Sequence, residues 1–150
     1  MIVYFDSSAL VKRYIAEPAS AQVEILVAEA DIAATSLITR AEVAAALARA
    51  VRMNWLTHDV AARALKAFQQ HWSVLFRLNI REATIERAEG LAWEQGLRGY
   101  DAVHLACALF LNDTLLNNGL PAPVVLASDG DLLAAALAEG LLTDDPTLHP

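Results

Sequence analysis

Residues 1–14 read MIVYFDSSALVKRY, and the interpretation of the whole chain starts from this stretch. The run from Ile2 to Phe5 is too short for a helix and rich in β-branched and aromatic side chains, so it predicts a buried strand. Apolar residues at helical spacing follow at once, so Asp6 lies where a strand ends and a helix begins. Ligands bind at this carboxyl edge in open α/β sheets. Packing gives little reason for a carboxylate there, and Asp6 is therefore the first candidate functional residue.

The composition indicates a single domain spanning residues 1–150, with a tail from Asp144 to Pro150 that we expect to be frayed. With 56% hydrophobic residues, a chain of this length buries a core without disulfides or metals as supports. Cys107 is the only cysteine, which excludes an internal disulfide and predicts a reducing, cytoplasmic location. No apolar run reaches the roughly 18 residues that span a bilayer, and a signal peptide is not expected. We therefore expect no membrane association.

The net charge of −7 is unevenly distributed. Residues 1–98 hold all 11 Lys and Arg together with 11 acids, whereas residues 99–150 hold seven acids and no basic residue. These acids form either a solvated surface or a site for a cation or a basic partner. The acidic balance argues against strong non-specific binding to nucleic acid, which needs many contacts from basic side chains to phosphates.

Short apolar runs alternate with helical patterns, which predicts an α/β fold of three layers. We expect a mostly parallel central sheet of four to five short strands, flanked by about seven helices. The expected strands cover residues 2–5, 31–36, 75–80, 124–127 and 141–143, and the expected helices cover 7–16, 19–29, 37–52, 57–74, 82–95, 101–111 and 131–139. Ser36 or Thr39 should cap the third helix and Gly96 should end the fifth. Residues 112–123 are turn-rich and are expected to be mobile.

Four acids occur in contexts of the same kind. Asp6 and Asp129 each follow a predicted strand, and Glu42 and Asp101 lie at the starts of helices that should begin at the same edge of the sheet. Each has an ordinary explanation, because acids cap helices and favour the positive end of the helix dipole. Gathered at one edge, however, they would repel one another. A divalent cation resolves this repulsion, and carboxylates are the hard oxygen ligands suited to Mg²⁺ or Mn²⁺.

Four segments, in this order, resemble the PIN-domain ribonucleases, and most closely the VapC toxins of type II toxin–antitoxin pairs: DSSALVKRY, TRAEVAAAL, LRGYDAVHLACA and ASDGDLLAAALAEGL. The resemblance covers almost the whole chain and implies a PIN-like fold. It implies that Asp6, Glu42, Asp101 and Asp129 form one acidic pocket holding one or two Mg²⁺ or Mn²⁺ ions. Asp6, Asp101 and Asp129 would be ligands, and Glu42 would bind directly or through water.

The resemblance also implies supporting residues around this pocket. A small polar residue usually follows the first Asp, and Ser7 is the expected candidate, ahead of Ser8. Family members often carry Thr or Ser two residues before the last Asp, where this chain has Ala127, and Ser128 is then the neighbouring hydroxyl. Asp131 is a further candidate ligand.

The activity implied by the resemblance is endoribonucleolytic hydrolysis of RNA phosphodiester bonds by the toxin of a VapBC-type pair. Such toxins form homodimers and are neutralised by a VapB-like antitoxin. Arg40 and Arg98 flank two of the acids, and they either grip substrate phosphate or form salt bridges with the pocket acids. His104 lies on one helix face with Asp101, where we expect it to pack and form hydrogen bonds rather than bind metal.

Two other functions were weighed. A catalytically silent PIN-fold module for protein–protein regulation stays open. A phosphate-accepting receiver-like domain is disfavoured, because it needs a second acid before the strand-end Asp and a late Lys, whereas Phe5 precedes Asp6 and no Lys follows Lys66. Spacing places Trp72 and Trp93 in the core, and Trp55 stays a candidate for stacking on a base.

Overall fold

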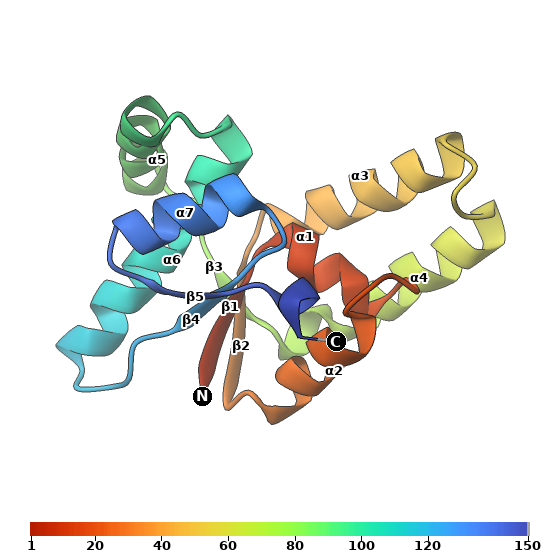
Figure 1. Ribbon diagram of the computed structural model, residues 1–150, viewed down its shortest axis with the longest axis horizontal. Helices are drawn as coiled ribbons and strands as arrows, with labels where there is room; N and C mark the ends of the chain where they lie inside the picture. Colours follow the sequence, from red (N-terminus) through yellow and green to blue (C-terminus); the bar gives the residue numbers. More distant parts are fainter. Residues whose placement is uncertain (150) are drawn as a thin grey trace.

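The computed structural model describes residues 1–149 as a five-stranded sheet between two layers of helices (Figure 1). The strands are β1 (Ile2–Phe5), β2 (Ile32–Ser36), β3 (Phe76–Leu78), β4 (Val124–Leu126) and β5 (Leu142–Asp144). Their order in the sheet is β3-β2-β1-β4-β5, and every neighbouring pair is parallel. All strands therefore end at the same edge of the sheet, and the predicted α/β class is confirmed.

The central strand β1 packs against one helical layer on each face. The helices are α1 (Ser7–Leu10), α2 (Ser20–Glu29), α3 (Thr39–Arg52), α4 (His58–His71), α5 (Glu82–Gln95), α6 (Gly99–Asn117) and α7 (Gly130–Ala138). Ile2 and Tyr4 contact the layer of α5, α6 and α7, whereas Val3 and Phe5 contact the layer of α1 to α4. The pleat sends successive side chains to opposite faces. Because both faces are covered, β1 is apolar at every position.

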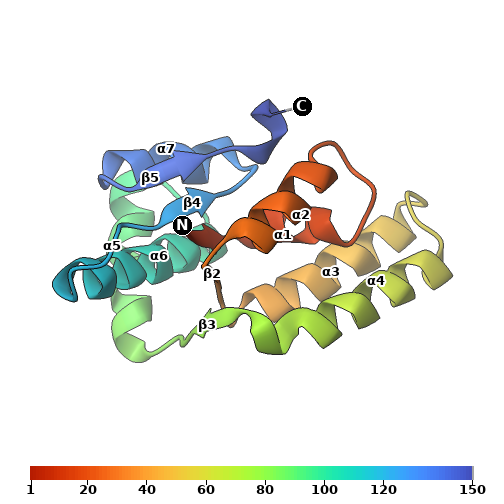
Figure 2. The same cartoon turned by 90° about the horizontal axis from the view of Figure 1, so that it is seen from below.

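Helices α3 and α4 form a hairpin that extends beyond the sheet (Figures 1 and 2). Thr57 caps α4, because its hydroxyl accepts a hydrogen bond from the amide of Val60 at 3.2 Å. Near the other end of α4, Phe68 is fully buried. The centroid of its ring lies 5.4 Å from the ring centroid of Tyr14 and 5.4 Å from that of Trp72. Trp72 is thus a core residue, as its spacing predicted.

Two expectations about helix starts and lengths were wrong. The first helix ends at Leu10 and continues only as a 3₁₀ turn, Val11–Arg13. Helix α3 begins at Thr39 without a side-chain cap, because the hydroxyl of Thr39 pairs with that of Thr35 at 2.7 Å. Thr35 in turn donates to the carbonyl of Phe5 at 2.7 Å. These buried hydroxyls join the ends of β1 and β2 instead of capping the helix.

We expected residues 112–123 to be mobile, and this was wrong for the first half of the segment. Helix α6 continues to Asn117, with Leu111 and Leu115 buried in the core. The side chains of Thr114 and Asn118 donate to the carbonyls of Phe110 and Thr114, each at 2.8 Å. The polar residues of this segment therefore lie on the solvent side of a helix rather than in a loop.

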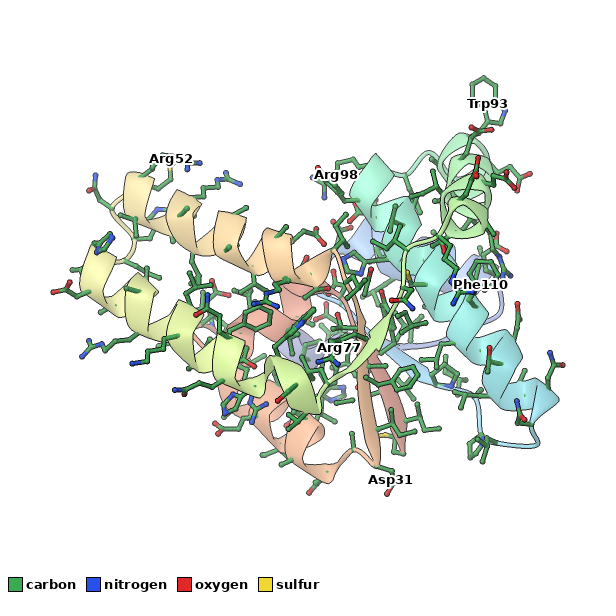
Figure 3. All side chains as sticks on the ribbon, turned by 180° about the vertical axis from the view of Figure 1, so that it is seen from behind. Asp31, Arg52, Arg77, Trp93, Arg98 and Phe110 are labelled. Carbon is green, nitrogen blue, oxygen red and sulfur yellow. The ribbon has the colours of Figure 1, made fainter. Side chains whose placement is uncertain are left out.

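The chain end and Trp93 differ from expectation as well. Instead of fraying from Asp144, the chain places that residue in β5 and forms a 3₁₀ turn at Pro146–Leu148, and His149 Nε2 lies 2.7 Å from Asp144 Oδ1. Pro150 lies outside the described residues. Trp93 is 89% exposed on α5, because the buried positions of this helix, Thr84, Ala88 and Leu91, turn it outward (Figure 3).

Other features follow the sequence closely. Gly96 ends α5 in a left-handed conformation with φ of +67°, as predicted for this residue. Trp55 is exposed on the loop between α3 and α4. Among residues 1–149, no helix has the length and apolar character needed to cross a membrane.

Candidate active site at the carboxyl edge of the sheet

Asp6 is a buried carboxylate at the end of the central strand. Its side chain is 2% exposed, and it caps α1 by accepting a hydrogen bond from the amide of Ala9 at 2.9 Å. The hydroxyl of Ser8 lies 2.9 and 2.7 Å from its two oxygens. Burial raises the pKa of Asp6, and the electrostatic interaction with His104 and these hydrogen bonds offset the rise in part. Asp6 is therefore a desolvated, rigidly held carboxylate that a cation would stabilise.

Ser8, rather than Ser7, makes the contact with Asp6. The Ser8 oxygen also accepts a hydrogen bond from the amide of Ser128 at 3.0 Å, which links the ends of β1 and β4. The sequence favoured Ser7, and this choice was wrong, because the contact depends on which serine turns back toward the cap of a short helix. The hydroxyl of Ser128 is buried and has no hydrogen-bond partner among the described residues.

The two serines provide a matched test of this arrangement. We expect Ser8→Ala to lower catalytic activity about 10- to 100-fold, the usual loss when a group that orients a metal ligand is removed. It should also destabilise the protein by about 1–3 kcal/mol, because a buried amide and a carboxylate lose their partner. Ser7→Ala should leave both properties nearly unchanged. Cleavage assays and thermal unfolding of both variants measure the difference, and equal effects would contradict the assignment.

Asp101 and Asp129 come from different elements and meet at one guanidinium group. Arg98 donates from Nε to Asp101 at 3.1 Å and from Nη2 to Asp129 at 2.9 Å. Its side chain is 79% exposed, while those of Asp101 and Asp129 are only 14% and 22% exposed. Burial raises the pKa of Asp101; Asp129 adds to the rise, and Arg98 opposes it. Arg98 thus holds two mutually repelling carboxylates together.

Asp129 also shapes the local backbone. Its other oxygen accepts hydrogen bonds from the amides of Asp131 and Leu132, at 2.9 and 3.1 Å, and so caps α7. Asp131 contributes its backbone amide to this cap. Asp129 therefore caps a helix, which is the ordinary explanation for an acid at such a position. Its second oxygen still accepts a hydrogen bond from Arg98.

Glu42 is held by a residue whose role the sequence did not reveal. Its carboxylate Oε1 lies 2.5 Å from His104 Nε2, although 62 positions separate the two residues in the chain. His104 is 1% exposed on α6, and its Nδ1 lies 2.8 Å from the hydroxyl of Tyr4 on β1. The only sequence signal was the three-residue spacing from Asp101, which places both side chains on one helix face. His104 packs and forms hydrogen bonds, as we expected. The sequence did not reveal that Glu42 is one of its partners.

Arg40, the other flanking arginine, lies away from the carboxylates. Its guanidinium carbon is 5.7 Å from the centroid of the Trp72 ring, and that of Arg77 is 5.9 Å from the same centroid. Arg40 is exposed and takes part in none of the ion pairs formed among residues 1–149. Of the two expected arginines, only Arg98 therefore forms salt bridges with pocket acids.

The carboxylate groups at this edge are of a chemical type that binds metal ions. Carboxylate oxygens suit a hard divalent cation, and Arg98 shows that a cationic group fits between Asp101 and Asp129. Within residues 1–149, no three acidic, histidine or cysteine side chains are arranged closely enough to hold a metal. Arg98 pairs with two of the carboxylates, and His104 pairs with Glu42. The unpartnered hydroxyl of Ser128 adds a free oxygen donor at this edge.

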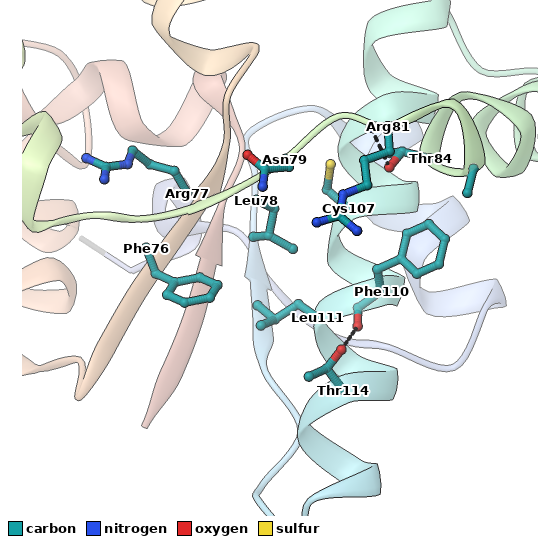
Figure 4. A pocket seen from close by; sticks show the side chains of 11 residues that line it. Phe76, Arg77, Leu78, Asn79, Arg81, Thr84, Cys107, Phe110, Leu111 and Thr114 are labelled. Carbon is teal, nitrogen blue, oxygen red and sulfur yellow. Dashed lines mark hydrogen bonds between the residues drawn. The ribbon is translucent and has the colours of Figure 1, made fainter.

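A separate cavity of about 390 Å³ lies beside β3 (Figure 4). Its lining includes Leu78, Phe110, Leu111 and Cys107, and none of the four acids contributes to it. Burial raises the pKa of the Cys107 thiol, which keeps it protonated and a poor nucleophile. This cavity is therefore distinct from the acidic edge and offers no rival catalytic group.

The five-stranded parallel sheet between helical layers is consistent with a PIN domain. The family model for the PIN domain matches residues 3–136, and the chain belongs to this family. The chain is similar to two curated proteins of Mycobacterium tuberculosis, Ribonuclease VapC49 of strain H37Rv and Ribonuclease VapC45 of strain CDC 1551. Each is 35% identical over 149 residues, which is 99% of both chains.

Solved structures share the fold at lower identity. The toxin–antitoxin complex from Klebsiella pneumoniae is 21% identical, with a TM-score of 0.54 over 85% of this chain and 86% of that one. The structure of VapBC2 from Rickettsia felis bound to a promoter DNA fragment is 13% identical, with a TM-score of 0.59 over 97% and 98% of the two chains. At these identities the similarity shows the fold alone.

Proposed function

We propose that this protein is a divalent-metal-dependent endoribonuclease and the toxin of a VapBC-type toxin–antitoxin pair. The observation that carries the proposal is the meeting of Asp101 and Asp129 at one cation, at the sheet edge where Asp6 is buried. Burying and gathering acids is unfavourable unless a cation compensates. The relatives named Ribonuclease VapC supply the reaction class.

Each acid has a defined part in the proposed reaction. Asp6, Asp101 and Asp129 would hold Mg²⁺ or Mn²⁺, as one or two ions, and Glu42 would bind directly or through water. Such an ion supplies an acidified water near neutral pH and neutralises charge on the scissile phosphate. Ser8 and the Ala9 amide keep Asp6 in one orientation. His104 does the same for Glu42.

The arginines would bind the substrate backbone. Arg98 is highly exposed, so its guanidinium can leave the two carboxylates and contact an RNA phosphate in a bidentate manner. Arg40 is exposed near the start of α3, two residues before Glu42, where it would contact a neighbouring phosphate. Arg98 therefore has two alternative partners, the pocket acids and the RNA.

We further propose a VapB-like antitoxin as the partner, a homodimer as the working form and the cytoplasm as the location. The seven acids of residues 99–150, without any basic residue, complement a basic segment of such a partner. The structural neighbours from Klebsiella pneumoniae and Rickettsia felis are complexes of this type by name. The single buried cysteine fits a reducing compartment.

The direct test is cleavage of RNA by the purified protein. With Mg²⁺ or Mn²⁺ it should cut transfer or ribosomal RNA, and chelation should stop the reaction. Expression should arrest growth, and Asp6→Asn should relieve the arrest. Intact RNA in both metals, together with arrest that persists in Asp6→Asn, would contradict the proposal.

A catalytically silent module is the second candidate, and one observation favours it. Arg98 pairs with both Asp101 and Asp129, as a structural salt bridge would. Calorimetry separates the two functions, because a silent module that folds correctly would show no Mn²⁺ binding.

Replacement of Arg98 by glutamine should strengthen metal binding. The guanidinium competes with the ion for two carboxylates, but solvent screens this exposed pair and keeps its contribution small, so we expect Mn²⁺ to bind only about two- to fivefold more tightly. Titration calorimetry measures this change. Arg87→Gln is the matched control, because Arg87 pairs with Asp113 at 2.9 Å elsewhere. Weaker Mn²⁺ binding in Arg98→Gln would contradict the competition.

A further inference from the structure

His104 bridges two layers of the fold at the candidate site. Its ring is 1% exposed, and each nitrogen has a partner: Nδ1 lies 2.8 Å from the Tyr4 hydroxyl, and Nε2 lies 2.5 Å from Glu42 Oε1. Tyr4 is on the central strand, His104 on α6 and Glu42 on α3, which covers the other face of the sheet. The three side chains form one continuous chain of hydrogen bonds between these elements.

The direction of these hydrogen bonds follows from the groups involved. An ionised carboxylate only accepts, so Nε2 must carry the proton that it shares with Glu42. In a ring that carries its proton on Nε2, Nδ1 accepts a hydrogen bond from the hydroxyl of Tyr4, which is fully buried. Burial also raises the pKa of Tyr4 well above its usual value, so this hydroxyl keeps its proton. Tyr4 thereby fixes the ring form that donates toward Glu42.

We propose that His104 is a positioning residue that orients the Glu42 carboxylate for the reaction through its Nε2–H group. This inference rests on the proposed function. Glu42 needs such a partner because a glutamate side chain loses much rotamer freedom when it is fixed, and α3 begins without a side-chain cap that would order its first turn. A buried imidazole held by a second hydrogen bond fixes the carboxylate at little further entropic cost.

Two substitutions that differ by one methylene separate positioning from simple core filling. In His104→Gln, the amide nitrogen reaches the place of Nε2 and can donate to Glu42. In His104→Asn, the amide reaches only the place of Nδ1, so it keeps the contact with Tyr4 and loses the one with Glu42. Both variants lose the imidazole ring and its packing, and thermal unfolding reports that shared cost.

We expect His104→Asn to lower kcat about 10- to 100-fold, in line with the loss of other ligand-orienting groups, with KM for RNA within about threefold. His104→Gln should stay within about fivefold of the wild-type kcat. In a Glu42→Gln background the two variants should have equal activity, because the group to be oriented is gone. Two results would overturn the inference. One is equal kcat of His104→Asn and His104→Gln in the otherwise wild-type protein, and the other is a difference between them that persists when Glu42 is replaced by Gln.

A spectroscopic readout keeps this test separate from that of the proposed function. Imidazole ¹⁵N shifts of the metal-free wild-type protein should show a protonated Nε2 on His104, and a bare Nε2 would overturn the inference whatever the activity. If the wild type cleaves RNA and the two variants do not differ, the positioning role fails and the ribonuclease stands. If the wild type cleaves no RNA, the proposed function fails, and with it the catalytic purpose of the contact.

Discussion

Asp6→Asn is expected to abolish most RNA cleavage while the fold stays intact. The substitution keeps the shape of the side chain and an oxygen that accepts from the Ala9 amide, and it removes the negative charge needed to hold the metal. Loss of one such preorganised electrostatic group reduces kcat by about 10²–10³-fold. Cleavage assays with Mg²⁺ and Mn²⁺ measure the effect. Asp59→Asn, at a 96% exposed side chain in the first turn of α4, is the control and should retain full activity.

Asp6→Asn should not lower the stability of the metal-free protein, although it lowers the activity. Burial raises the pKa of Asp6 in the folded state above its unfolded value, so the folded state binds more protons between the two pKa values. The free energy of unfolding therefore falls as pH rises from the unfolded-state pKa to the folded-state pKa of Asp6. The stability lost in this range is still missing at neutral pH. Asp6→Asn removes this cost, so we expect a Tm at pH 7 equal to or above that of the wild type. A lower Tm, or retained cleavage, would contradict the assigned role.

Phe68→Ala should produce the largest loss of stability. Phe68 is fully buried and packs edge-on against Tyr14 and at a tilt against Trp72, with a centroid distance of 5.4 Å in each pair. Truncation of such a residue destabilises a protein by about 3–5 kcal/mol, which lowers Tm by roughly 6–20 °C for a chain of this size. The layer of α1 to α4 contains the start of α3, so activity at elevated temperature should fall with it. Chemical and thermal unfolding measure the change.

Trp93→Ala is the matched control for this prediction. The Trp93 side chain is 89% exposed on α5, so its removal should change the free energy of unfolding by no more than about 0.5 kcal/mol. A large loss in Trp93→Ala would mean that this side chain is covered in solution. A small loss in Phe68→Ala would contradict the packing of the α3–α4 layer.

The sheet and its edge were predictable because strong local patterns define them. Ile2–Phe5 is apolar at every position, which occurs where both faces of a strand are covered, and the structure places β1 at the centre of the sheet. The position of Asp6 follows directly from that strand. Asp129 likewise follows β4, and α6 begins at Gly99, so that Asp101 falls in its first turn.

Other features depend on contacts that no local pattern contains. Ser7 and Ser8 are identical in composition and adjacent, and only the geometry of a four-residue helix decides that Ser8 reaches Asp6. The pairing of His104 with Glu42 joins residues 62 positions apart across two helices. The end of α6 was misjudged because Asn112 to Thr114 resemble a turn, whereas buried leucines on the same helix keep it in place. Trp93 was misjudged because its spacing from the apolar residues Leu91 and Leu97 suggested a core position, whereas the buried face of α5 runs through Thr84, Ala88 and Leu91.

The central claim is that Asp6, Asp101 and Asp129 hold one shared divalent cation. A crystal soaked in Mn²⁺ tests it most directly, because the anomalous signal locates the ion and its ligands together. We predict a peak about 2.0–2.2 Å from oxygens of these three carboxylates, with the guanidinium of Arg98 withdrawn from Asp101 and Asp129. An edge without Mn²⁺ at millimolar concentration, with Arg98 still bridging both carboxylates, would contradict the claim.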